Sequence, residues 1–245
     1  PVNDSLIYLV SGSTIHKSID LCTTFDSVAI SPNTDIYELF VSKNGTIWIS
    51  TGSSLYSSIN GGYFWDLKFS TSSIKKFNKV VIFDNGTGYT SNDVLYKTSD
   101  HGNTWNQTIF QPFTADGFDF LNSNTGLITG PSGNIYLTHN GGSTYSEIVV
   151  PGMYFPELVY MKDEFNFFAR AYNLHSTYDG GMMWKVNDFG NTTEPHQFQW
   201  MTMYDHFEGI GVSSGNRGSG IWKTSNRGNT PVELSSFKAF KFGRE

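Results

Sequence analysis

Thr98-Ser99-Asp100-His101-Gly102-Asn103-Thr104-Trp105 follows the pattern Ser/Thr-x-Asp/Asn-x-Gly-x-x-aromatic. Three further segments match this pattern in full, and two match it in part, with Cys22 in the glycine position of one and Pro231 in the aromatic position of the other. We call all six segments motif turns; they begin at Ser18, Ser58, Thr98, Thr138, Thr177 and Thr224. Successive starts lie 40, 40, 40, 39 and 47 residues apart. A repeat of this length indicates a chain built from similar supersecondary units.

Two further columns repeat in phase with the motif turns. An aliphatic residue stands three positions before each start, in the series Ile15, Leu55, Leu95, Ile135, Leu174 and Ile221. An aromatic residue or histidine stands two positions before it, in the series His16, Tyr56, Tyr96, Tyr136, His175 and Trp222. Matched columns at one period exclude coincidence and set the phase of the repeat.

Alternating apolar and polar residues place four short strands in each interval. Around the motif turn at Thr138 these strands are expected at Phe118–Leu121, Gly126–Thr129, Asn134–Thr138 and Thr144–Val149. Residues suited to tight turns separate them. The sequence therefore predicts an all-β, six-bladed β-propeller with four-stranded antiparallel blades.

The two ends of the chain are predicted to complete one blade together. Residues 5–10 have the pattern of a second strand, so the first blade lacks its innermost strand. A C-terminal alternating segment at about 237–243 is expected to supply that strand and close residues 1–245 into a single domain, because an open ring exposes sheet edges. The chain begins with Pro1 and not Met, which we interpret as a processed product or a fragment.

Composition narrows the class of protein. Aromatic residues make up 16% of the 245 residues, which excludes intrinsic disorder. Charged residues are also 16%, below the typical ~25%, and the net charge is −6, so we expect no nucleic-acid partner. No run approaches the ~18 apolar residues of a membrane-spanning helix. A single cysteine, Cys22, excludes an internal disulfide and a cysteine-based zinc site.

The motif turns resemble Asp-box motifs, or BNR repeats, of the sialidase-like β-propellers. The resemblance implies that each lies between the third and fourth strands of its blade. The acidic or amide side chains there are suited to accept hydrogen bonds from their own turns. We therefore assign a structural role to Asp20, Asn60, Asp100, Asn140, Asp179 and Asn226. They are not expected to bind calcium, because no motif turn ends in the bidentate glutamate of a calcium loop.

The resemblance also raises sialic-acid hydrolysis as an activity. That family uses three arginines on the substrate carboxylate, a tyrosine nucleophile with a glutamate partner, and an acidic proton donor. This chain has four arginines, of which Arg227 lies in a motif turn and Arg244 is the penultimate residue, leaving only Arg170 and Arg217. Sequence motifs for nucleotide, zinc or serine-hydrolase chemistry do not occur. We favour a protein that is not an enzyme and expect no cofactor and no metal.

Loops that break the period are the candidate binding region. The 47-residue interval adds residues to the 187–195 connection and the 215–220 turn, and the 149–156 and 110–113 connections are unusually apolar. Aromatic and methionine side chains are enriched at interface centres. The predicted contact residues are Phe113, Met153, Tyr154, Phe155, Glu194, His196 and Arg217. An equally weighted alternative is that these loops plug the mouth of a central channel.

The leading hypothesis is an interaction module that docks a protein partner within a cell-surface or virion-surface assembly. Low charge, a single cysteine and abundant Ser, Thr and Asn favour an extracytoplasmic location. So do five Asn-x-Ser/Thr sequons, at Asn3, Asn44, Asn85, Asn106 and Asn191. The alternative is a glycan-binding or glycoside-hydrolase propeller. Carboxylate pairs carry such hydrolysis, and the candidates by position are Asp116, Glu157, Glu194 and Glu208.

Overall fold

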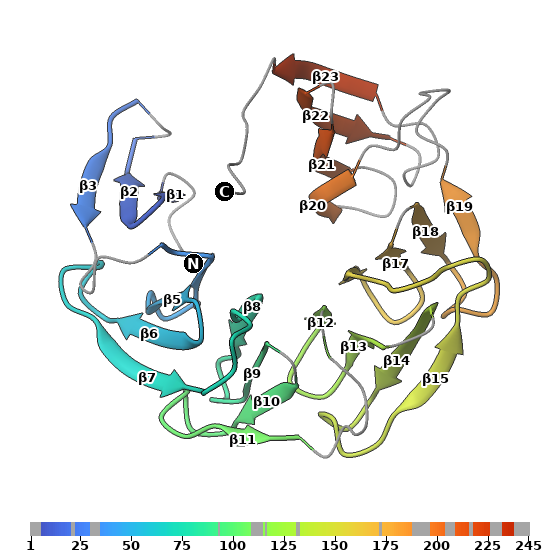
Figure 1. The fold of residues 1–245 in the computed structure, drawn as a ribbon, viewed down its shortest axis with the longest axis horizontal. Coiled ribbons are helices and arrows are strands. Elements are labelled where there is room, and N and C mark those ends of the chain that lie inside the picture. The colour runs from blue at the N-terminus through green and yellow to red at the C-terminus, as the bar shows by residue number, and fades with distance from the viewer. Residues whose placement is uncertain are drawn as a thin grey trace. The chain divides into compact units, whose positions relative to one another are not determined.

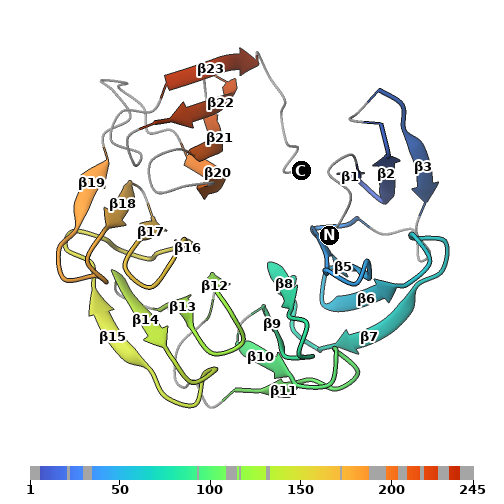
Figure 2. The same ribbon diagram turned by 180° about the vertical axis from the view of Figure 1, so that it is seen from behind.

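Every regular element in the described part of the protein is a β-strand. The computed structural model describes residues 6–20, 23–29, 35–92, 94–108, 115, 117–130, 133–171, 173–187, 197–203, 209–215, 218–225 and 232–237. These strands form six antiparallel sheets that follow one another along the chain (Figure 1; Figure 2 shows the reverse side). Three sheets belong to a first compact unit and three to a second, which we describe separately.

The first unit runs to Gly117 and includes two short later segments, Asn122–Asn124 and Gly141–Ser143. Its first sheet has three strands, and the next two have four. The strands are β1 (Ile7–Ser11), β2 (Thr14–Ser18), β3 (Asp26–Ala29), β4 (Glu38–Val41), β5 (Ile47–Thr51), β6 (Ser54–Ser58), β7 (Asp66–Ser70), β8 (Lys79–Ile82), β9 (Gly88–Ser91), β10 (Leu95–Thr98) and β11 (Asn106–Gln107).

The second unit holds three four-stranded sheets, each with its strands in chain order. Its strands are β12 (Phe118–Phe120), β13 (Gly126–Thr129), β14 (Asn134–Thr138), β15 (Ser146–Val149), β16 (Leu158–Met161), β17 (Phe167–Arg170), β18 (Leu174–Thr177), β19 (Lys185–Asn187), β20 (Gln197–Met203), β21 (Gly209–Gly215), β22 (Gly218–Thr224) and β23 (Val232–Phe237). Asp119 links two of these sheets, since its Oδ2 accepts a hydrogen bond from the Met161 N–H at 2.8 Å.

The all-β, antiparallel architecture predicted from the repeat is confirmed. The expected strands Gly126–Thr129 and Asn134–Thr138 coincide with β13 and β14, and the first sheet has three strands among the described residues. Phe237, expected to begin the closing strand, instead ends β23 and pairs with Ser219. The rest of that segment, residues 238–243, lies outside the described residues, so closure stays a prediction.

Aromatic side chains fill the space between neighbouring sheets within each unit. In the first unit Trp48 meets Trp105 edge-on, with ring centroids 6.5 Å apart, and Phe69 stacks on Trp105 at 6.0 Å. In the second, Phe167 packs edge-on against Trp184 of its own sheet at 5.7 Å, and both lie in the core cluster that includes Leu127 and Ile135 of the preceding sheet. Each such buried side chain contributes about 1.5–3 kcal/mol through removal of apolar surface from water. Part of the high aromatic content of the chain therefore serves to join sheet to sheet.

The motif turns are closed by a compact set of hydrogen bonds. The Thr98 hydroxyl donates to Asp100 Oδ1 at 2.8 Å and accepts from the Gly102 N–H at 3.0 Å. Asp100 Oδ1 also accepts from the Thr104 N–H at 2.9 Å. The indole N–H of Trp105 donates to the Gly102 carbonyl at 3.1 Å. Gly102 has a φ of 79°, in the left-handed region that favours glycine.

The same side chain-to-backbone bond recurs in every motif turn that the structure describes in full or in large part. The acceptor Oδ1 belongs to Asp20, Asn60, Asn140 or Asp179, and the donor is the N–H four residues later. Asn226 lies outside the described residues. Asp and Asn thus form one equivalent set, because only the Oδ1 lone pair is needed.

Candidate functional site

Each sheet that is followed by another has the motif turn at one end and the connection to the next sheet at the other. In the fourth sheet β15 begins after the motif turn and ends at the 150–157 connection, which leads to β16. The motif turn and this connection therefore lie at opposite ends of the same strand. We call the end with the strand-to-next-sheet connections the connection end. Of the predicted contact residues, Met153, Tyr154 and Phe155 lie on this connection.

The 150–157 connection is fixed to the protein core. Val150 and Met153 are buried beside Val159 and Phe167. The Met153 N–H donates to the Val150 carbonyl at 3.2 Å, which closes a tight turn. A Cβ at Gly133, whose φ is 88°, would overlap the Met153 carbonyl oxygen, so only glycine permits this approach. The connection is therefore held from two sides.

Met153, one of the predicted contact residues, does not reach the surface of this structure. Its exposed fraction is 3%, because the flexible thioether fills a gap in the core of the second unit. The two residues that follow do point to solvent, with exposed fractions of 73% for Tyr154 and 75% for Phe155. Phe155 has a φ of 50°, which is rare for a bulky residue. Strained backbone of this kind often marks a functional segment.

The other predicted contact residues are not part of the described structure. Phe113, Glu194, His196 and Arg217 lie outside the described residues. Of the proposed carboxylates Asp116, Glu157, Glu194 and Glu208, only Glu157 is described.

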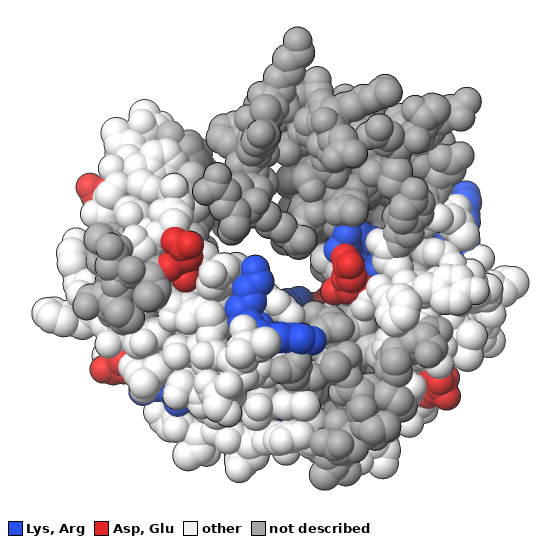
Figure 3. Space-filling model, in the orientation of Figure 1, with Lys and Arg blue, Asp and Glu red and all other residues white. Residues whose placement is uncertain are grey.

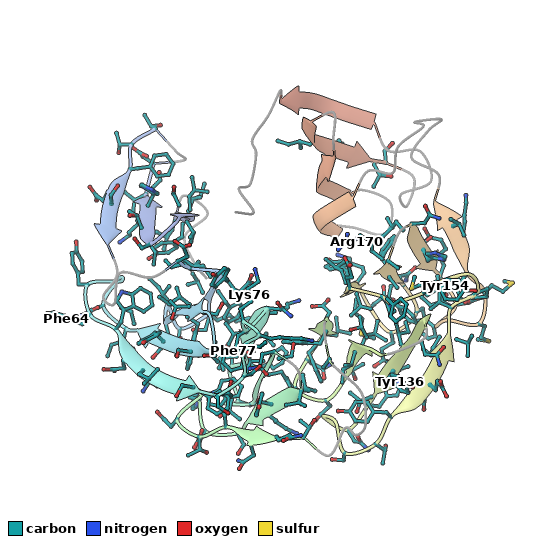
Figure 4. All side chains as sticks on the ribbon, in the orientation of Figure 1. Phe64, Lys76, Phe77, Tyr136, Tyr154 and Arg170 are labelled. Atoms are coloured by element: carbon teal, nitrogen blue, oxygen red, sulfur yellow. The ribbon has the colours of Figure 1, made fainter. Side chains whose placement is uncertain are left out.

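Glu157 forms an ion pair with Arg170 at the connection end of the fifth sheet. Glu157 Oε2 lies 2.9 Å from Arg170 Nη2, and the Glu157 N–H donates to the Arg170 carbonyl at 2.9 Å. The Arg170 side chain is 9% exposed and the Glu157 side chain 66%. Burial lowers the pKa of Arg170 from its ordinary value, and Glu157 partly opposes that shift. Figure 4 shows Arg170 at the end of β17 and Tyr154 on the connection before β16.

Sequence reasoning treated Arg170 only as a possible member of a sialidase set. Its position carried a further signal. In three sheets, the residue that begins the first strand pairs with a residue near the end of the second strand. These pairs are Glu38 with Ser50, Lys79 with Ser91, and Leu158 with Arg170. A small hydroxyl residue in two sheets is thus replaced by an arginine in a third. Aligning the sequence at its 40-residue period shows this exchange of serine for arginine. The sequence does not show that the guanidinium is buried.

The first unit has charged and aromatic groups at its own connection end. Lys76 Nζ lies 4.3 Å from the centre of the Tyr37 ring, a cation–π contact. Burial raises the pKa of Glu38 to about 7, and the Lys79 charge partly opposes this. Lys76 is labelled beside β8 in Figure 4. Charged atoms are otherwise sparse over the described surface seen in Figure 3.

The described residues contain no group of three or more His, Cys, Asp or Glu placed to hold a metal ion. Within the same described ranges no helix is long and apolar enough to cross a membrane.

Two of the sequons have a structural explanation. Asn44 and Asn85 each lie within a hairpin turn, and the Oδ1 of each accepts the N–H of the threonine two residues later, at 3.1 and 3.0 Å. The intervening Gly45 and Gly86 both have a φ of 84°. Asn-Gly-Thr therefore suits this turn, which accounts for the two sequons without glycosylation. Asn106 lies in β11, and Asn3 and Asn191 lie outside the described residues.

Comparisons with known proteins identify the fold. No protein-family model matches the sequence, and no curated protein matches it. Among solved structures, "YCF48 bound to D1 peptide" has a TM-score of 0.71 at 11% identity, covering 94% of this chain and 77% of that one. A streptogramin B lyase has a TM-score of 0.73 at 15% identity, covering 96% and 82%. A GH74 xyloglucanase from Xanthomonas campestris has a TM-score of 0.74 at 14% identity, covering 94% of this chain and 44% of that one.

The chain is therefore a β-propeller. Within that class these neighbours include a peptide-bound protein and a glycoside hydrolase, and identities this low show the fold alone.

Proposed function

We propose that this protein is a non-enzymatic interaction module, a six-bladed propeller of the Asp-box type that docks a protein partner through its connection end. The observation that carries the proposal is the exposed pair Tyr154 and Phe155 on a connection anchored by buried Val150 and Met153. In the same proposal, residues 238–243 close the propeller, and the protein works outside the cytoplasm in a surface assembly.

An anchored aromatic pair suits protein recognition for an energetic reason. Binding costs free energy for each side chain and loop that must become ordered, so a connection already held in place loses less. Aromatic residues also dominate the small set of interface positions that carry most binding energy. Leaving two such rings in water is unfavourable for the isolated protein. A partner that covers them recovers that free energy.

The solved neighbour named as YCF48 bound to D1 peptide supports this class of function, since it is a propeller with a peptide ligand. The GH74 neighbour supports the alternative, a glycan-binding or glycoside-hydrolase propeller, because exposed aromatic rings also stack on sugars. Tyr154 and Phe155 fit either ligand by shape. Their place on the same connection as Glu157, which pairs with Arg170, favours a protein surface with both apolar and charged groups.

Site-specific photo-crosslinking tests the proposal. A benzoylphenylalanine at position 154 is expected to capture a defined partner in the source cells, whereas the same group at Tyr63 is expected to capture none. Tyr63 is a matched control because it is equally exposed but lies in a motif turn, at the opposite end of its sheet.

Binding to the purified partner then provides the quantitative test. The double variant Y154S/F155S is expected to weaken binding by at least about 2 kcal/mol, roughly thirtyfold, with an unchanged melting temperature. Y63S/F64S serves as the control. Equal capture at both positions, or full binding by Y154S/F155S, contradicts the proposed face. Saturable binding on a glycan array without a protein partner favours the alternative, and turnover of a fluorogenic glycoside overturns the non-enzymatic reading.

A further inference from the structure

Arg170 introduces a large cation at a position that other sheets fill with a small residue. Ser50 and Ser91 occupy the equivalent place, and both are fully buried. Arginine is almost never buried to this degree unless it is paired. A buried arginine in place of a serine calls for a partner of opposite charge.

The guanidinium is incompletely paired among the described residues. Nη2 donates to Glu157 Oε2, while the buried Nε has no hydrogen-bond partner in the described part of the protein. Leaving a buried donor unsatisfied costs about 1–3 kcal/mol, and more for a charged group. Nε–H and an Nη–H of arginine form a fork whose spacing matches the two oxygens of a carboxylate. Glu157 therefore accepts a hydrogen bond from Nη2 but leaves the Nε–H donor of the fork unsatisfied.

Glu157 is a weak occupant of this site. Its side chain is two-thirds exposed, so water competes for its charge, and the structure gives it one contact with the guanidinium, Oε2 to Nη2. Ion pairs with an exposed member contribute only about 0.2–1 kcal/mol. A second carboxylate therefore has little free energy to overcome when it displaces Glu157.

We propose that Arg170 is a carboxylate-binding site, occupied by Glu157 in the unbound protein and by an acidic side chain of the protein partner in the complex. The incoming carboxylate takes Nη2 and Nε together, and Glu157 swings into water. Only the source of the carboxylate rests on the proposed function. Phe155 and Tyr154 stand two and three residues before Glu157 on the same connection, so a partner that covers this connection is expected to carry apolar side chains in the same segment as its acidic one.

Nuclear magnetic resonance tests the site without a partner. The chain has only four arginines, and Arg170→Lys identifies the Arg170 Nε–H signal by its loss. Sodium acetate is the probe, with sodium chloride at the same ionic strength as the reference. We expect a saturable shift of this signal with acetate alone. Glu157→Gln removes the competing carboxylate and is expected to tighten acetate binding about twofold to fivefold.

A second ion pair provides the matched control. Lys43 and Asp84 lie 3.2 Å apart, with both side chains exposed. Asp84→Asn is expected to create no saturable acetate site at Lys43, because nothing there is buried or unsatisfied. Equal shifts with acetate and chloride, or no shift in the Glu157→Gln protein, overturn the proposal.

Two further probes test the source of the carboxylate. The peptide acetyl-Leu-Asp-Leu-amide is expected to bind more tightly than acetate, and Y154S/F155S is expected to reduce it to the acetate level. Sodium glucuronate is expected to bind no more tightly than acetate. Tighter binding of glucuronate than of the peptide overturns the protein source. If acetate binds at Arg170 but crosslinking captures no partner, the Arg170 site is supported and only the proposed function is contradicted.

Discussion

Asp100 and Thr104 are joined twice: the Thr104 N–H donates to Asp100 Oδ1 at 2.9 Å, and its hydroxyl donates to Oδ2 at 2.7 Å. Hydrogen bonds to the charged form lower the pKa of the Asp100 carboxyl from 3.8 to about 2. Asp20 has the same two bonds to Thr24 and the same direction of shift. A side chain that is open to water thus keeps its negative charge to a lower pH, because its own turn donates hydrogen bonds to it.

The first prediction concerns acid stability. Because the pKa of Asp100 is lower in the folded state, its contribution is complete above pH 3.8 and is lost as the pH falls towards 2. Asp100→Asn is expected to flatten this part of the curve and change stability little at pH 7. Asn140 occupies the equivalent position in another motif turn, where its Nδ2 donates to the Thr144 hydroxyl at 2.8 Å. An amide can therefore replace the second bond that the Asp100 carboxylate makes. Urea unfolding from pH 2 to 7 measures this, and an unchanged acid slope contradicts it.

The second prediction concerns the close approach at Gly102. A Cβ there would overlap the Trp48 ring, and the φ of 79° is unfavourable for alanine. Gly102→Ala is expected to lower the free energy of unfolding by roughly 3 kcal/mol or more. Gly52→Ala separates the two causes, because Gly52 has a φ of 67° but no atom within 4 Å of its Cβ. We expect about 1–2 kcal/mol there, measured by chemical denaturation. Equal losses in the two variants would mean that the Trp48 contact relaxes.

The third prediction concerns a buried histidine. His175 Nδ1 has no hydrogen-bond partner in the described part of the protein, and burial lowers the pKa of the ring below 6.5. The unfolded chain therefore takes up a proton first as the pH falls below 6.5, and stability decreases. His175→Phe is expected to remove this dependence. Phenylalanine suits the site better than tyrosine. Tyr136, at the equivalent position of another sheet, pairs with Glu147, to which its hydroxyl can donate, whereas His175 pairs with the apolar Val186.

Thermal melts between pH 5 and 7 test the His175 prediction. The control is His139→Gln, at an exposed histidine of a motif turn, and it should leave the slope unchanged. A His175→Phe protein that still loses stability at the parent rate below pH 6.5 would assign the dependence to another group.

The fourth prediction concerns Glu38, whose folded-state pKa is raised to about 7 by burial. Here the folded protein holds its proton more tightly than the unfolded chain, so stability falls as the pH rises from 4.5 to 7. Glu38→Gln is expected to be more stable than the parent at pH 8, by on the order of 2 kcal/mol after allowance for partial exposure to water. The two proteins should be equal near pH 4.5. The exposed Glu164→Gln is the control, and a pH-independent difference for Glu38→Gln contradicts the prediction.

The strands could be predicted from sequence because their signals are local. Gly126–Thr129 and Asn134–Thr138 were found from alternation and from the turn residues beside them, which depend on no distant contact. His101 shows that the turn forms even where the residue after the Asp or Asn is not glycine. It has a φ of 57°, where Gly61, Gly141 and Gly180 take the same left-handed region.

The candidate site could be predicted only in part. The apolar 150–157 connection was recognised, but sequence alone does not tell which of Met153, Tyr154 and Phe155 turns inwards, because a loop has no fixed side-chain period. The exception at Arg170 is visible in the repeat. Its orphan Nε is not, because satisfaction of a hydrogen bond depends on residues brought close by the fold.

The equivalence of Asp and Asn in the motif turns also bears on how such a chain can evolve. Asp20, Asp100 and Asp179 share one bond with Asn60 and Asn140, so an exchange at any of these positions leaves the turn intact. Each exchange nevertheless alters the net charge of −6 by one. The repeat thus offers a set of mutational steps by which solubility and acid tolerance can drift while the architecture stays constant.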